Sequence, residues 1–124
     1  MTAATTTHAQ ALTAAADALA RATIGNAGEL SISELYSMTA ELVDGCRNLT
    51  QIVAQLVAHV DARSKAVPMR VDHYGAAQYG TPDNAQADAR AVLYRASVLL
   101  DVATDRLGHA LSPLSTLAET AGRR

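Results

Sequence analysis

The sequence predicts an all-α protein: an antiparallel helical bundle of three main helices, two of them long, with a C-terminal helical segment after Pro113. Leucine recurs every seven residues in two separate stretches, at Leu35, Leu42, Leu49 and Leu56 and again at Leu93, Leu100, Leu107 and Leu114. This period places side chains on one helical face, whereas a strand would alternate every second residue. The chain is also rich in alanine and contains no Phe and no Trp. Small side chains let helices approach closely, so the composition favours packed helices over a sheet.

Residues 1–124 are expected to form a single domain, because 124 residues is an ordinary length for one. The predicted elements, in chain order, are a frayed N-terminus at 1–7, helices at 8–23 and 32–66, a loop at 67–81, a helix at 82–111 and a helical extension at 112–122. The two long helices carry the leucine repeats, and we expect them to lie antiparallel on either side of the loop.

Capping and proline signals set the predicted helix boundaries. Ser31 and Glu34 have the spacing of a capping box at the start of the second helix. Pro68 should end that helix, because the residue before a proline disfavours α geometry. Pro82 is suited to the first position of the next helix. Pro113 has no N–H to donate, so we expect a kink or a restart of the helix there.

The helix at 32–66 has more apolar surface than one partner helix can cover. Its apolar arc spans about 160°, whereas a two-stranded seam uses only two positions of each heptad. The first helix, about 25 Å long, would cover only the half of the hairpin far from the loop. We therefore expect an uncovered strip that pairs with a second copy, giving a homodimer, or with another helical protein. The residues predicted at this interface are Leu49, Val53, Leu56, Val57, Val60 and Val92.

The loop at 67–81 is a second candidate surface. Connections between helices of a bundle usually have about 2 to 8 residues, so this loop is longer than the fold requires. It carries residue types that are enriched at interface hot spots, namely Met69, Arg70, His73, Tyr74 and Tyr79. Two interpretations stay open: the loop binds a partner, or Tyr74 and Tyr79 fold back over the open end of the bundle.

No catalytic, cofactor-binding or metal-binding residues are predicted, and no cofactor. Asp105 and His109 share a helical face, but His59 should lie about 30 Å from His109 along the helix axis, too far to complete a metal site. Cys46 has no histidine at helical spacing and fits a small buried hydrophobe. We therefore expect a non-enzymatic protein with a structural, adaptor or regulatory role.

An all-α enzyme remains the alternative outside the class of binding proteins. Its substrate would be an anionic metabolite in a pocket lined by arginine side chains. The residues available for such a pocket are Arg47, Arg90, Arg95 and Arg106.

Net charge and hydropathy limit the classes of partner and the cellular locations that we expect. The net charge of −2 and the scattered basic residues argue against nucleic acid as a partner. No uncharged apolar stretch reaches the roughly 20 residues that span a membrane, and no signal peptide is recognised, so we expect a cytoplasmic protein. Arginine supplies all basic residues except Lys65, a bias typical of GC-rich bacterial genomes, and we expect a bacterial or phage source.

The short, alanine-rich helical hairpin also resembles the WXG100 and PE-type proteins that type VII systems of actinobacteria export. Tyr79 and Asp83 match the spacing of the Tyr-x-x-x-Asp/Glu export signal of those families. In this chain the motif lies between the two long helices, ahead of the third helix, and the Trp of the Trp-x-Gly turn is absent. The resemblance implies, as a further alternative, a secreted helical hairpin.

Overall fold

The structure of the protein is a computed structural model that describes residues 3–25 and 28–119. The described residues form four helices and no strand, so the all-α prediction is confirmed. The helices are α1 (Ala3–Ile24), α2 (Ile32–Ala66), α3 (His73–Tyr79) and α4 (Pro82–Thr116).

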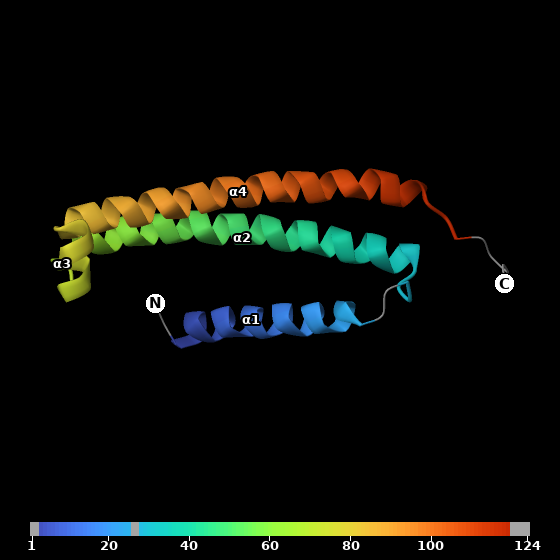
Figure 1. The fold of residues 1–124 in the computed structure, drawn as a ribbon, viewed down its shortest axis with the longest axis horizontal. Coiled ribbons are helices and arrows are strands. Elements are labelled where there is room, and N and C mark those ends of the chain that lie inside the picture. Colours follow the sequence, from blue (N-terminus) through green and yellow to red (C-terminus); the bar gives the residue numbers. More distant parts are fainter. Residues whose placement is uncertain (1–2, 26–27, 120–124) are drawn as a thin grey trace.

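The two long helices α2 and α4 form a hairpin and lie side by side in opposite directions along most of their length (Figure 1). An ion pair joins Asp61 to Arg90 near the connecting segment. At the other end, the Glu119 carboxylate accepts a hydrogen bond of 3.0 Å from the backbone N–H of Ile32. Among the helices that the structure describes, the short helix α3 contacts only α4.

Helix α1 runs beside α2 but, over the described residues, packs against none of the other helices (Figure 1). Its residues from Ala4 to Ile24 are exposed, including the leucines of its apolar stripe, Leu12 and Leu19. Alanine makes up most of that stripe, so α1 has little apolar surface to bury. The packing of α1 into a three-helix bundle stays a prediction.

On α2, the leucine repeat is protected from solvent only in part, because Leu35 and Leu49 are half-buried whereas Leu42 and Leu56 are exposed. One series of buried and half-buried positions, with spacings that alternate between four and three, runs along α2 to its C-cap and forms the seam: Thr39, Val43, Cys46, Thr50, Val53, Val57, Val60, Ser64 and Val67. Val43, at 4% exposure, is the buried hydrophobic residue among those described. Leu42 and Leu56 each precede a residue of this seam and are 42% and 45% exposed. One position turns a side chain by about 100°, so the leucines lie at the edge of the seam.

On α4, by contrast, the leucine repeat does lie in the seam. Half-buried residues of this repeat are Leu93, Leu100, Leu107 and Leu114. Thr104 is buried beside them, and its hydroxyl donates a hydrogen bond of 2.7 Å to the backbone carbonyl of Leu100. That bond satisfies the hydroxyl within its own helix, so it needs no partner on α2. The seam therefore packs long leucines of α4 against valines and other small residues of α2.

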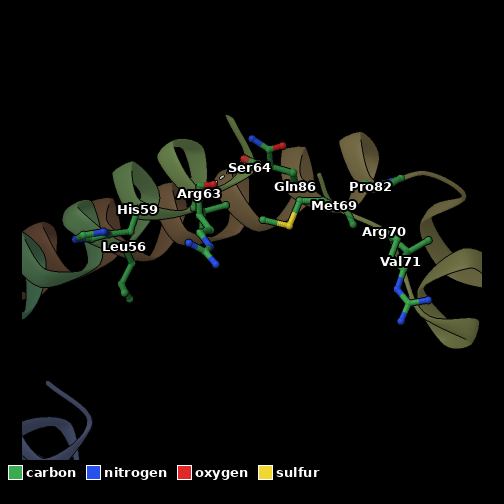
Figure 2. A pocket seen from close by; sticks show the side chains of 11 residues that line it. Leu56, His59, Arg63, Ser64, Met69, Arg70, Val71, Pro82 and Gln86 are labelled. Atoms are coloured by element: carbon green, nitrogen blue, oxygen red, sulfur yellow. Dashed lines mark hydrogen bonds between the residues drawn. The ribbon is translucent and has the colours of Figure 1, made fainter. Parts of the chain in front are cut away.

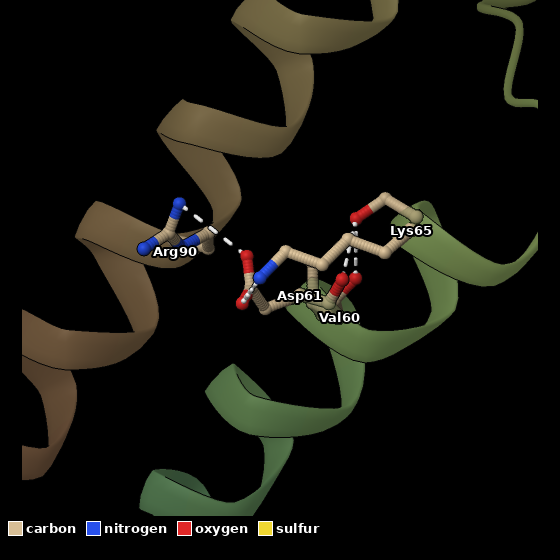
Figure 3. A network of polar contacts seen from close by, with 5 residues as sticks. Val60, Asp61, Lys65 and Arg90 are labelled. Atoms are coloured by element: carbon tan, nitrogen blue, oxygen red, sulfur yellow. Dashed lines mark hydrogen bonds and ion pairs between the residues drawn. The ribbon is translucent and has the colours of Figure 1, made fainter.

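A polar network closes the seam near the connecting segment (Figure 3). The Asp61 carboxylate lies 3.1 Å from the Lys65 ammonium, one turn along α2, and 3.7 Å from the Arg90 guanidinium on α4. The hydroxyl of Ser64 donates to the carbonyl of Val60 at 2.7 Å. Asp61 thus links the two long helices by charge at a position where the seam is partly open to solvent.

Local sequence signals account for the starts of both long helices. Ser31 Oγ accepts from the Glu34 N–H, and the Glu34 carboxylate accepts from the Ser31 N–H, both at 3.1 Å, which confirms the capping box. Thr81 Oγ1 accepts from the Asn84 N–H at 3.3 Å, and Pro82 occupies the first turn of α4.

We expect Ser31→Ala to lower the free energy of unfolding by about 1 kcal/mol, because it removes the side-chain acceptor of the capping box. Urea unfolding followed by circular dichroism measures the change. Ser33→Ala, an exposed position in the first turn of α2, is the matched control and should leave the free energy nearly unchanged. If Ser31→Ala lowers the free energy of unfolding no more than Ser33→Ala does, the capping box does not stabilise the protein.

Two boundaries differ from the prediction. Helix α1 begins at Ala3 instead of residue 8, since the intervening residues contain no helix breaker. Helix α4 runs through Pro113 and ends at Thr116, without a restart. Leu111 and Leu114 are half-buried on either side of the proline, so packing holds the helix together across the lost backbone bond. Residues 117–119 are not helical, and 120–122 of the predicted extension lie outside the described residues.

The predicted loop at 67–81 contains helix α3. Asp72 caps it, with a carboxylate oxygen that accepts from the Gly75 N–H at 2.7 Å. Gly80 ends it with a φ of 80°, a conformation that favours glycine. The segment therefore carries its own short element between the long helices, which the length of the loop alone did not predict.

Candidate functional site

The structure divides the predicted interface residues into two groups. Val53, Val57 and Val60 are half-buried and follow the spacing of the α2 seam. Leu56 and Val92 are exposed on α2 and α4. Leu49 is half-buried, on the same leucine repeat as Leu56. Only part of the predicted strip thus stays accessible to another molecule.

A larger set of apolar side chains is exposed on the two long helices. On α2 the exposed leucines and isoleucine are Leu42, Ile52 and Leu56. On α4 the exposed aliphatic residues are Val92, Val98, Leu99 and Val102, with Leu99 63% exposed. The sequence pattern predicts Leu99 on the main apolar stripe of this helix, facing Leu49 across the hairpin, and this prediction is wrong because Leu99 is exposed. The signal for the exposure of Leu99 was available, because it follows Val92 by one heptad.

A pocket of about 480 Å³ lies where the two long helices meet the connecting segment (Figure 2). Its apolar lining consists of Leu56, Val60, Met69, Val71, Pro82 and Ala85, and its polar lining of His59, Arg63, Ser64, Arg70 and Gln86. In Figure 2, Met69 lies between the side chains of Arg63 and Arg70. The pocket joins residues that the sequence analysis assigned to two separate surfaces, the interface strip and the loop.

The other loop residues lie on α3. Tyr74 is 83% exposed, and its ring meets that of His73 edge to face, with centroids 5.6 Å apart. Tyr79 is half-buried, and its carbonyl accepts a hydrogen bond of 3.0 Å from the Asn84 side chain. Tyr74 therefore does not cover the hairpin, whereas Tyr79 is held against the start of α4.

The four arginines of the enzyme alternative do not share one site. Arg47 and Arg106 line a hollow of about 570 Å³ together with Asp101, Asp105 and His109. Arg90 pairs with Asp61 near the other end of the hairpin. The hollow therefore holds acidic as well as basic side chains, with the Asp105–His109 pair at 3.7 Å.

Within residues 3–25 and 28–119, no three side chains of the types His, Cys, Asp and Glu lie together as a metal site would require. None of the helices in that part of the chain combines the length and the apolar character needed to span a membrane. The outward apolar side chains of α2 and α4, with the pocket at the connecting segment, are thus the candidate functional site. Searches with family models, against curated proteins and against solved structures found no match for this chain.

Proposed function

We propose that this protein is a non-enzymatic helical protein–protein interaction module that self-associates through exposed aliphatic side chains of its long helices. The observation that carries the proposal is the row of large apolar residues that the hairpin leaves exposed on α4, with Leu99 at 63% exposure. Burial of a leucine or valine side chain stabilises an assembly by about 1.5 to 3 kcal/mol, and contiguous apolar surface marks interaction sites.

The proposed surface differs in part from the one that the sequence predicts. Val92 stays in it, because it is exposed on α4. Leu56 leaves it, because it lies on the edge of α2 next to α1. Val53, Val57 and Val60 leave it, because they are half-buried in the seam of α2, although Val60 also lines the pocket at the connecting segment. Leu99 and Val102 take their place, and the surface moves toward the outer side of α4.

The antiparallel three-helix bundle belongs to the same proposal. Leu12 and Leu19 are one heptad apart on α1, and Leu19 lines a hollow with Met38 and Leu42 of α2. At the other end of α1, Thr5 lines a hollow with Leu56. We propose that α1 closes onto this edge of α2, which leaves the outer side of α4 for a second copy.

Light scattering across a concentration series tests self-association. We expect the molar mass to rise from monomer to dimer with concentration, and Leu99→Asp to hold the protein as a monomer, since it places a carboxylate in the apolar surface. Ala91→Asp adds the same charge at an exposed position next to that surface and should leave the dimer intact. A wild-type monomer at every concentration would contradict self-association.

A cytoplasmic location is part of the proposal, and its alternative is the secreted helical hairpin. Cell fractionation separates them, because a secreted protein accumulates in the culture medium.

A further inference from the structure

Helix α4 carries a second stripe with heptad spacing, separate from the seam that packs on α2. Its members are spaced alternately by four and three residues: Asp88, Val92, Arg95, Leu99, Val102 and Arg106. All six are exposed. At 100° per residue, this outer stripe lies about 120° around the helix from the seam leucines. The spacing is that of a helix with a second helical partner.

No helix in the described part of the chain covers the outer stripe. Helix α1 lies beside α2, where Leu19 and Thr5 line hollows with α2 residues, and it does not reach α4 (Figure 1). The short helix α3 meets α4 at the connecting segment. The outer stripe is therefore available to another molecule.

The charged side chains of the outer stripe form no ion pairs among the described residues, and the stripe is acidic at one end and basic at the other. Asp88, Arg95 and Arg106 form no ion pair with any side chain that the structure describes. The acid lies at the end nearest the connecting segment and Arg106 at the opposite end, with Val92, Leu99 and Val102 as the aliphatic part between them. A stripe that is acidic at one end and basic at the other is complementary to its own copy in the reverse direction.

We propose that a second copy of this chain binds the outer stripe in antiparallel orientation, about a two-fold axis that crosses the stripe at the level of Ser97 along the helix. Asp88 and Arg106 are equally far from Ser97 in opposite directions along the helix, as are Val92 and Val102. Asp88 of each copy then faces Arg106 of the other, and Val92 faces Val102. The two-fold axis makes each of these contacts twice.

The same charges disfavour the competing arrangement. In a parallel pair in register, Asp88 would face Asp88 and Arg106 would face Arg106, so both ends would repel. In the antiparallel pair, Arg95 faces Leu99 at the centre. The aliphatic part of the arginine packs over the leucine while its guanidinium reaches solvent. A polar residue at such a position specifies register at some cost in stability.

This inference rests on the self-association proposed above and adds its orientation and register. Charge reversal tests the pairing, with the dimer dissociation constant measured by sedimentation equilibrium. We expect Asp88→Arg and Arg106→Asp each to raise that constant at least about tenfold, because each change creates two like-charge contacts. The double variant Asp88→Arg, Arg106→Asp restores opposite charges and should return the constant to about that of the wild type.

The matched control is Asp101→Arg, an identical charge change at an exposed position of α4 outside the outer stripe. It should leave the dissociation constant close to the wild-type value, and circular dichroism should show equal helix content in all variants. A wild-type dimer that is insensitive to Asp88→Arg, or a double variant no tighter than the single ones, would overturn the register but not self-association. A wild-type monomer at every concentration would overturn both.

Disulfide cross-linking tests the orientation independently. In a Cys46→Ala background, which removes the half-buried thiol of the seam, one variant carries Val92→Cys and another carries Val102→Cys. A disulfide needs Cβ atoms about 4 Å apart. We expect the mixture of the two variants to form covalent dimers on mild oxidation. Each variant alone should not, since the introduced thiols of its two copies would lie about 15 Å apart along the helix axis. Efficient cross-linking of Val92→Cys alone would contradict the antiparallel pair.

Discussion

Val43→Asp should abolish the folded hairpin. Val43 is 4% exposed at the contact between α2 and α4. The arginine one turn further along α2, Arg47, already pairs with Asp44 and is 68% exposed, so it points to solvent and not into the seam. An unpaired charge at a buried position costs several kcal/mol, which is comparable to the total stability of many small domains, about 5 to 15 kcal/mol. We expect the variant to lose most of its helical circular dichroism signal at 25 °C and to show no cooperative melting transition.

Leu42→Asp is the control for this prediction. It replaces the neighbouring residue, which is 42% exposed at the edge of the seam, with the same charged side chain. Substitutions at exposed positions usually change the free energy of unfolding by no more than about 0.5 kcal/mol. Replacement of a leucine at the edge of the seam should cost slightly more than this, so the melting transition should persist. Loss of folding in Leu42→Asp as well would contradict the assignment of the seam.

Val57→Asp should lower the stability of the single chain instead of separating two copies. Val57 is half-buried in the α2 seam, where α4 is its neighbour. We expect the free energy of unfolding to fall by about 2 to 3 kcal/mol and the melting temperature to fall by roughly 10 °C. The loss should be the same in dilute and concentrated solution, because an intermolecular contact would make it depend on concentration.

Leu56→Asp distinguishes the two positions. Leu56 is 45% exposed, so its replacement should leave the melting temperature of the dilute protein within a few degrees of the wild type. If Val57→Asp instead gives a monomer with unchanged melting temperature, the valine faces a second copy, as the sequence alone predicts. A small loss for Leu56→Asp beside a large loss for Val57→Asp would place the seam as the structure has it.

The helices of this protein could be predicted because their signals are local. Ser31 and Glu34 form the predicted capping box, and Pro82 begins α4 as expected. The seam of α2 could not be chosen from its period, since leucines and valines repeat every seven residues at adjacent positions. Which repeat faces the partner depends on how α4 packs, and on α2 the valines, including Val43, take that place.

The candidate site was predicted in part for a similar reason. The exposure of Leu56 and Val92 follows from an apolar arc wider than one partner can cover. The pocket lined by Leu56 and Met69 forms because the connecting segment folds back beside the end of α2, and no local sequence pattern predicts this packing. The sequence pattern of Pro82 predicts only a helix start, and the structure shows that Pro82 also lines this pocket.

The hydrogen bond between Ile32 and Glu119 makes the Ile32 amide a probe of whether the hairpin is closed. The Ile32 N–H belongs to the first turn of α2, where the helix itself supplies no acceptor. Its acceptor, the Glu119 carboxylate, is 87 residues away along the chain. This contact needs the far end of α4 to have returned to the start of α2. Protection of this single amide against hydrogen exchange is thus a measure of hairpin closure as a whole, separate from the helicity of either arm.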